Sequence, residues 1–224
     1  MPEALSPRRR AVRPRDAATL ILVRQDGPRR QVLMGRRNAS HSFMPGVWVF
    51  PGGRVDRADF RAPTASDLRP EVEAVLHGYL KPGRARAVAL AAIRETFEEA
   101  GLLLAAPAPP RPAVGPWRDF LAQGVAPDLA ALEVLGRAIT PPHLSRRFDT
   151  WFLMAAADRL VSLDRQPDCG ELEEIAWHDF EAALELPLAE ITRTMIGEAV
   201  ARLDNPARQR PFLRRGVFGA QGEL

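Results

Sequence analysis

The sequence predicts an α/β or α+β sandwich, in which strands of mixed direction surround one long helix. Short apolar runs with strand-favouring residues recur between turn signals along most of the chain. One segment, residues 85–104, is rich in Ala, Leu and Glu and holds no proline, so it predicts the longest helix. Of the 224 residues, 46% are hydrophobic, which is enough to bury the core of one large domain.

The first part of the chain predicts an antiparallel pair of strands. "AATLILV", residues 17–23, has the pattern of a buried strand, and "QDGPRR" then predicts a turn. "QVLMG", residues 31–35, is expected to return antiparallel to the first strand. A short strand is expected at "VWVF", residues 47–50, where "PGG" ends it. Two glycines after a proline predict a sharp bend or the close approach of a ligand.

Helices and strands alternate beyond this glycine pair. Residues 60–84 have the character of an insertion, and the middle of the insertion predicts one amphipathic helix. Two short helices are expected between residues 117 and 136. The remaining elements are expected to be strands in 137–142, 146–157 and 172–177, a helix from 178, and a mostly helical tail from 191.

These elements divide the chain into a basic flexible arm at 1–16, a folded domain at 17–190 and a helical extension at 191–224. A net charge of +3 is too balanced for a dedicated nucleic-acid binder. The single cysteine excludes an internal disulfide and fits a reducing compartment. No apolar run has the length needed to cross a membrane, so a cytoplasmic protein is expected.

Three glutamates lie close together in the long helix, in the stretch "RETFEEAGLLL". At 100° per residue, one stripe faces the core and consists of Leu90, Ile93, Phe97, Ala100 and Leu104. Glu95, Glu98 and Glu99 fall on the opposite side, where one interpretation is a solvated face. However, like charges three and four residues apart repel by about 0.2–0.5 kcal/mol. A shared divalent cation removes this repulsion, and Mg²⁺ prefers oxygen ligands, so a metal site is the second interpretation.

The same stretch resembles the second half of the Nudix box, R-E-U-x-E-E-x-G-U, in which U is aliphatic. The matching residues are Arg94, Glu95, Glu98, Glu99, Gly101 and Leu102, and Thr96 stands where an aliphatic residue is usual. "FPGGRVDRAD" supplies the first half, G-x5-E, with Gly53 and with Asp59 in place of glutamate. Between Asp59 and Arg94 lie 34 residues where the family has seven, so this box carries an insertion of about 27 residues.

This resemblance implies a Nudix-type α/β/α sandwich with a mixed sheet, an insertion within the box and extra C-terminal helices. It implies that Mg²⁺ or Mn²⁺ is held by the glutamates, with the carbonyl of Gly52 as a further ligand, and that Arg94 orients the glutamates. Gly53 and Gly101 are needed for the shape of the backbone. The implied metal ligands are Glu95, Glu98, Glu99 and Gly52, and the implied catalytic residues include Arg94 and Glu98.

The resemblance leaves the general base and the phosphate contacts open. Nudix enzymes often take the base from the helix or from an acidic loop before a late strand, and "PDCGELEEIAW" is such a loop. Glu171 and Glu174 are the first choices there, and a solvated acidic loop is the alternative. For substrate phosphates, the expected contacts are Arg36, Arg37, Arg146 and Arg147.

With an insertion at this point of the box, the chain resembles a long-insert branch of the family, typified by the mammalian peroxisomal coenzyme A diphosphatase. The expected reaction is hydrolysis of the diphosphate of coenzyme A or an acyl-CoA, giving 3′,5′-ADP and 4′-phosphopantetheine or its acyl form. One alternative is a hydrolase of ADP-ribose, dinucleotides or nucleotide sugars. The other is an inactive Nudix domain that binds a nucleotide. The expected partner is a small nucleotide-derived substrate, and a homodimer is compatible with the resemblance.

Overall fold

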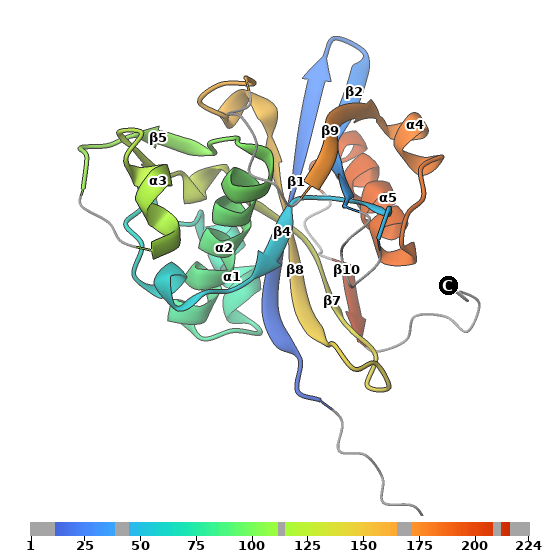
Figure 1. Ribbon diagram of the computed structural model, residues 1–224, viewed down its shortest axis with the longest axis horizontal. Helices are drawn as coiled ribbons and strands as arrows, with labels where there is room; N and C mark the ends of the chain where they lie inside the picture. The colour runs from blue at the N-terminus through green and yellow to red at the C-terminus, as the bar shows by residue number, and fades with distance from the viewer. Residues whose placement is uncertain (1–11, 39–44, 112–114, 165–171, 208–211, 216–224) are drawn as a thin grey trace, which may run out of the picture.

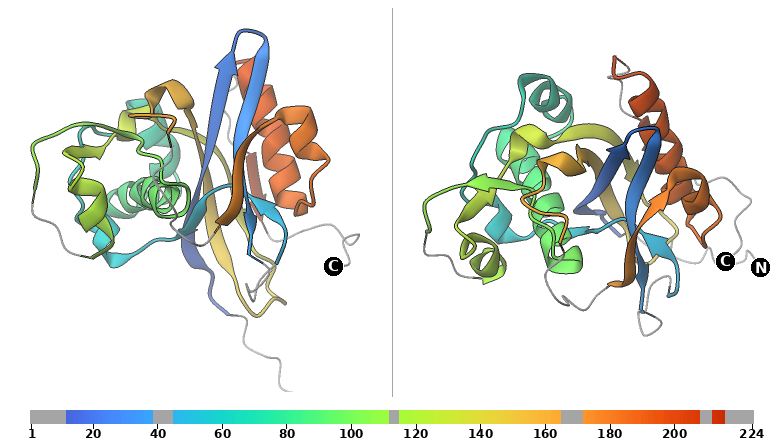
Figure 2. Two further views of the ribbon diagram at one scale, coloured as in Figure 1. Left: turned by 45° about the horizontal axis from the view of Figure 1, so that its top comes forward. Right: turned by 90° about the horizontal axis from the view of Figure 1, so that it is seen from above.

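The computed structural model describes residues 12–38, 45–111, 115–164, 172–207 and 212–215. A mixed sheet separates two layers of helices, and different helices cover its two faces (Figure 1). The view from above shows the sheet edge-on between these layers (Figure 2, right). The sandwich predicted from the sequence is therefore confirmed.

Among the described residues, eight strands form the main sheet, in the order β10-β7-β8-β1-β2-β3, with β4 paired to β1 and β9 paired to β2. Their bounds are β1 (Arg15–Asp26), β2 (Arg29–Arg37), β3 (Trp48–Val49), β4 (Gly52–Arg54), β7 (Glu133–Ile139), β8 (Phe148–Ala156), β9 (Leu172–Asp179) and β10 (Phe212–Arg215). The β1–β2 pair is antiparallel, as predicted, whereas β1 and β8 run parallel. Two short strands, β5 (Ala105–Pro107) and β6 (Val125–Pro127), form a second sheet.

The sheet forks along β1, and this fork positions the glycine pair. One side of β1 pairs with β8 from Arg15 to Val23. On its other side, β1 pairs first with β4 at residues 17–19 and then with β2 at residues 23–26. A Cβ on Gly52 would come within 2.6 Å of the Ala18 carbonyl oxygen, so only glycine allows β4 to approach β1 this closely.

One face of the sheet is covered by α2 (Pro82–Ala100) together with the short helices α1 (Pro70–His77) and α3 (Arg118–Leu121). Helix α2 begins three residues before its predicted start, with Pro82 in its first turn, and ends at Gly101. Gly101 has φ of 67°, the left-handed conformation that glycine adopts most easily. Leu104, predicted to complete the helical stripe, therefore lies beyond the helix, although its side chain is buried.

The other face of the sheet is covered by α4 (Phe180–Leu184) and α5 (Glu190–Asp204). Met195, Ile196 and Ala199 of α5 are fully buried in a cluster with Ile21 and Met34 of the sheet. Helix α5 is therefore one layer of the sandwich. Among the described residues, no helix combines the length and the apolar character needed to cross a bilayer.

Two stretches differ from their predicted secondary structure. Residues 117–136 were expected to form two helices, but after the single helical turn of α3 they contain β6 and the start of β7. The tail from residue 191 was expected to be mostly helical, and α5 agrees with this, but β10 follows and pairs in parallel with β7. Pairing with neighbouring strands outweighs the intrinsic helix preference of Ala, Leu and Glu in the first stretch.

Candidate metal and diphosphate site

The glutamates of α2 face the glycine pair of β4. The backbone N–H of Gly52 donates a hydrogen bond of 2.8 Å to Glu99 Oε2. A Cβ on Gly53 would lie 2.4 Å from the carboxylate carbon of Glu95. The two halves of the box motif are thus in contact, although more than 30 residues separate them in the sequence. Glu99 is only 5% exposed, so the interpretation of the glutamates as a solvated face does not hold for this residue.

Arg94 connects these carboxylates to one another. Its Nη1 lies 2.9 Å from Glu95 Oε1 and donates a 2.6 Å hydrogen bond to Glu98 Oε2. Its Nη2 donates to the carbonyl of Arg54 at 2.9 Å, and its Nε donates to Asp59 Oδ1 at 2.9 Å. Burial alone lowers the pKa of Arg94, but the hydrogen bonds that Arg94 donates to Asp59 and the charges of Glu95 and Glu98 outweigh burial and raise that pKa. Arg94 therefore stays charged and holds the orientation of two glutamates.

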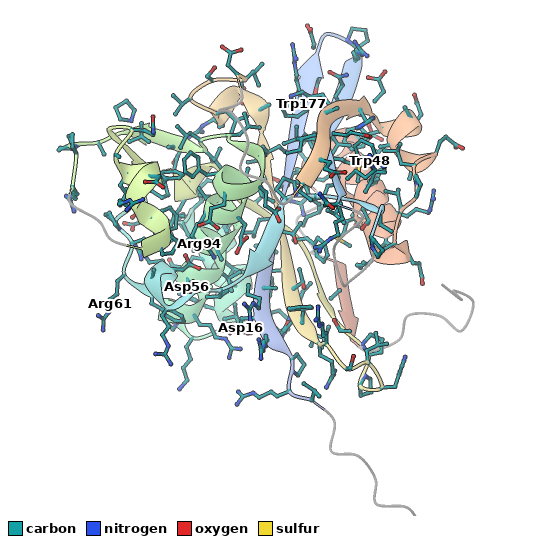
Figure 3. The ribbon with its side chains drawn as sticks, in the orientation of Figure 1. Asp16, Trp48, Asp56, Arg61, Arg94 and Trp177 are labelled. Carbon is teal, nitrogen blue, oxygen red and sulfur yellow. The ribbon has the colours of Figure 1, made fainter. Side chains whose placement is uncertain are left out.

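Asp59 is the buried counter-ion of this arginine. Its side chain is 0% exposed and accepts hydrogen bonds from two nitrogens of Arg94. It also accepts hydrogen bonds from the Trp117 indole N–H at 2.9 Å and from the Asp56 backbone N–H at 2.7 Å. Figure 3 shows Arg94 beside Asp56, where α2 meets the turn that carries Asp59. Sequence reasoning missed Trp117, because no local pattern links it to a motif 58 residues away.

The carboxylates fit a hard divalent cation by their chemistry. Glu95 and Glu99 line one cleft together with Gly52 and Gly53, and carboxylate oxygens are the ligands that Mg²⁺ and Mn²⁺ prefer. Within the part of the chain that the structure describes, no three acidic, histidine or cysteine side chains converge into a ready cage. This does not exclude magnesium, because Mg²⁺ commonly binds through one or two carboxylates, substrate phosphates and water.

The cleft beside these glutamates is large, with a volume of about 1710 Å³. It extends from α2 and β4 over the starts of β1 and β8 to the beginning of α5. Its arginines are Arg13, Arg15, Arg37, Arg54, Arg57, Arg84, Arg94, Arg146 and Arg193. Its apolar lining includes Phe50, Phe148, Phe152, Leu188 and Ile191. The cleft thus combines carboxylates for a cation, cations for phosphates and apolar surface for an organic group.

The four arginines predicted to contact phosphates do not lie together. Arg37 and Arg146 line the cleft. Arg36 forms an ion pair with Glu174, and neither residue is part of the cleft lining. Arg147 donates to the carbonyls of Val12 and Thr140, so it holds the backbone at one end of β1.

The predicted acidic loop is described only from Leu172 onward. Glu171 and Asp168 lie outside the described residues. Glu174 has φ of 49° and sits at the irregularity where β9 pairs with β2. Its neighbour Glu173 accepts a 2.5 Å hydrogen bond from Asn38. The structure thus joins Glu173 and Glu174 to β2 and places neither of them in the cleft lining.

Comparison with known proteins agrees with this geometry. The family model for the NUDIX domain matches residues 13–198, which is most of the chain. The chain therefore belongs to the Nudix family. Among curated proteins it is 29% identical to the acyl-coenzyme A diphosphatase NUDT19 of Gallus gallus and 28% identical to that of Homo sapiens. These matches cover 76% and 69% of this chain, but only 62% and 55% of the relatives.

Solved structures show the same fold. A NUDIX hydrolase from Alicyclobacillus acidocaldarius superposes with a TM-score of 0.62 at 27% identity, covering 84% of this chain and 92% of that one. The NUDIX domain of Shewanella oneidensis NrtR, solved with ADP ribose, superposes with a TM-score of 0.50 at 16% identity, covering 89% and 94%. At 16% identity, the second likeness concerns the fold alone.

Proposed function

We propose that this protein hydrolyses the diphosphate linkage of a nucleoside diphosphate derivative with the help of Mg²⁺ or Mn²⁺, and that its substrate is coenzyme A or an acyl-CoA. The products are 3′,5′-ADP and 4′-phosphopantetheine or its acyl form. The observation that carries the proposal is the position of Glu95 and Glu99 on the wall of an arginine-lined cleft.

The choice of coenzyme A is supported by two further observations. Relatives named acyl-coenzyme A diphosphatase match at 28–29% identity. The cleft of about 1710 Å³ exceeds the roughly 300–1,000 Å³ of common small-molecule sites and has both cationic and apolar walls. A long substrate with phosphates at one end and an organic arm at the other fits such a cleft. ADP-ribose, dinucleotides and nucleotide sugars are the alternative substrates.

The residues of α2 take the following roles in this proposal. Glu95 and Glu99 hold the cation, with the Gly52 carbonyl as a further ligand. When bound, the cation neutralises the diphosphate and the charge that develops as the bond to the leaving phosphate breaks. Arg94 positions Glu95 and Glu98, because it contacts both carboxylates. Gly53 leaves the space that the Glu95 carboxylate needs.

For the general base, we propose Glu98 ahead of Glu174. Glu98 is on the same helix as the proposed ligands, and its side chain is 35% exposed, so water reaches it. A carboxylate there accepts the proton of the water that attacks phosphorus. Neither Glu98 nor Glu174 is part of the cleft lining, but Glu98 directly precedes the proposed ligand Glu99, whereas Glu174 lies on β9 and pairs with Arg36. Arg37 and Arg146 are the proposed phosphate contacts, since both line the cleft.

A substrate panel tests the proposal. The protein is assayed with Mg²⁺ and with Mn²⁺ on coenzyme A, acyl-CoA, ADP-ribose and NADH. We expect coenzyme A or acyl-CoA to give the highest kcat/KM. Equal turnover of ADP-ribose, or no turnover of coenzyme A, would refute the proposed substrate but not the proposed diphosphatase activity. No turnover of any compound would instead support an inactive nucleotide-binding domain.

A matched pair of variants tests the metal site. Glu99→Gln should lower kcat by about 100-fold, because a neutral amide binds a divalent cation far more weakly than a carboxylate does. Glu190→Gln is the control, since Glu190 lines the same cleft but belongs to α5. Similar activity of both variants would refute the placement of the metal at α2.

A further inference from the structure

We infer that Trp117, acting through Asp59 and Arg94, is a positioning residue for the two glutamates that Arg94 contacts. The inference rests on the proposed metal site at α2. It adds a residue from outside the box motif, carried by a segment that approaches α2 only in the folded chain.

The Asp59 carboxylate has all its hydrogen-bonding positions occupied. A carboxylate offers about four lone-pair sites, and here four N–H donors reach it. Oδ1 accepts from Arg94 Nε and from Trp117 Nε1, both at 2.9 Å. Oδ2 accepts from Arg94 Nη2 at 3.1 Å and from Asp56 N at 2.7 Å. Of the three donor residues, Arg94 belongs to α2 and Asp56 to the turn of Asp59, whereas Trp117 belongs to neither.

The indole of Trp117 is placed rigidly by its packing. Trp117 is 2% exposed, and its ring packs edge-to-face on Phe120 at 5.2 Å. Phe120 packs in the same manner on Phe97, also at 5.2 Å. Phe97 belongs to α2 and immediately precedes Glu98. A row of three aromatic rings therefore fixes the indole N–H relative to the helix that carries the glutamates.

Arg94 connects Asp59 to the proposed ligand Glu95 and the proposed base Glu98. Arg94 donates hydrogen bonds to Asp59 through Nε and Nη2, and it contacts Glu95 and Glu98 through Nη1. If Asp59 rotates, the guanidinium that meets it side-on must turn as well, and Nη1 moves relative to both glutamates. Without its indole donor, the buried Asp59 keeps its three other N–H donors, but one lone pair has no partner and the orientation of the carboxylate is held less firmly. Loss of the Trp117 N–H should thus loosen Glu95 and Glu98.

The experiment compares two substitutions of buried tryptophans. Trp117→Phe keeps an aromatic ring but removes the bond to Asp59. Trp151→Phe is the control, because Trp151 is 1% exposed and its Nε1 has no hydrogen-bond partner among the described residues. Mn²⁺ binding is measured by electron paramagnetic resonance on each full-length variant, and folding by circular dichroism. The kinetic readout is kcat and KM for the best substrate of the panel.

We expect Trp117→Phe to bind Mn²⁺ about threefold to tenfold more weakly, with lower kcat and little change in KM. Groups directly behind metal ligands, such as Arg94 here, are worth about 10–100-fold in affinity, and Trp117 acts two residues further out, through Asp59. Trp151→Phe should bind Mn²⁺ like the wild type. Unchanged Mn²⁺ binding in Trp117→Phe, or the same loss in Trp151→Phe, would overturn the inference.

Two further results keep the test decisive. If the wild type binds no Mn²⁺, the proposed metal site itself fails, which is distinguishable from a wild type that binds and a Trp117→Phe variant that binds equally well. If Trp117→Phe does not fold, Phe120→Leu loosens the packing of the indole without removing its N–H. Weaker Mn²⁺ binding in that variant supports the inference, and unchanged binding overturns it.

Discussion

The carboxylate of Glu95 occupies the space in which a side chain on Gly53 would begin. A Cβ built on Gly53 would lie 2.5 and 2.6 Å from the two Glu95 oxygens, closer than carbon and oxygen atoms approach without a bond. The contact explains why a glycine at this point of β4 matters to a glutamate 42 residues later in the sequence. The constraint comes from the neighbour, since Gly53 is not among the glycines with positive φ.

Gly53→Ala should therefore displace the Glu95 carboxylate. We expect kcat to fall by about 100-fold, because a shift of roughly 1 Å in a catalytic group can have that effect. The measurement is steady-state kinetics with Mn²⁺, together with a thermal melt.

Gly197→Ala provides the control for this substitution. Gly197 lies in α5, and a Cβ there meets nothing within 4 Å. Alanine at this site should leave kcat unchanged and stabilise the protein by about 0.5–1 kcal/mol, because glycine weakens a helix interior. A Gly53→Ala variant with wild-type kcat would contradict the assigned role of the Gly53–Glu95 contact.

Asp59→Ala should be strongly destabilising. It leaves the guanidinium of Arg94, whose side chain is 5% exposed, without its bidentate partner. Breaking a buried ion pair by removing one partner costs about 3–5 kcal/mol. Urea denaturation followed by circular dichroism measures the change. Asp119→Ala removes an exposed partner of Arg118 and should leave the free energy of unfolding unchanged; an equal loss in both variants would argue against the special role of Asp59.

His178 should make the fold less stable in acid. Burial lowers the pKa of His178 below the ordinary 6.5, against the opposing effect of the neighbouring Asp179 carboxylate. Its ring packs edge-to-face on Trp48 at 4.8 Å, and its buried Nε2 has no hydrogen-bond partner within the described residues. Near and below pH 6.5 the unfolded chain therefore binds more protons than the folded chain at this residue. It follows that the free energy of unfolding falls as the pH falls through this range.

Urea midpoints at pH 7.5 and 5.5 check this expectation. His178→Gln cannot titrate, so its midpoint should change less between the two pH values than that of the wild type. The other three histidines of the sequence, His41, His77 and His143, remain in both proteins and contribute equally to each difference. The same pH dependence in variant and wild type would mean that His178 is not a source of acid sensitivity.

Local sequence patterns predicted the long helix and the β1–β2 pair well, because each depends on residues that are near one another in the chain. The helical wheel also grouped Glu95, Glu98 and Glu99 correctly. It could not show that Glu99 is buried, since the group that covers it is the Gly52 N–H, 47 residues away. The resemblance to the Nudix box had already assigned these two segments to one motif, and the structure shows that they are in contact.

The first half of strand β7 was missed for a different reason, whereas residues 137–139 lie in a predicted strand. Its sequence, "EVLGRAI", follows a run of Ala and Leu, and such composition favours a helix. Its antiparallel pairing with β8 and parallel pairing with β10 decide the outcome instead. Pairing partners lie far along the chain, so intrinsic preference alone does not reveal them. The same limit applies to Trp117, whose acceptor is set by tertiary packing.

The general base can be assigned by comparing Glu98→Gln with Glu174→Gln. If Glu98 takes the proton from the attacking water, Glu98→Gln should lower kcat by about 10²–10⁴-fold. Glu174→Gln retains an oxygen that can accept from Arg36, so its kcat and pH profile should match the wild type.

The opposite pattern is equally informative, because it would assign the base to the β9 irregularity where Glu174 has φ of 49°. Strained backbone of this kind often occurs at functional sites. In that case Glu174 must leave Arg36 and reach the cleft when substrate binds. Glu174→Gly tests this role. Glycine relieves the left-handed strain, worth about 1–2 kcal/mol, so the variant should fold stably, and it lacks the carboxylate that a base needs. A stable Glu174→Gly variant with full activity would leave Glu98 as the base.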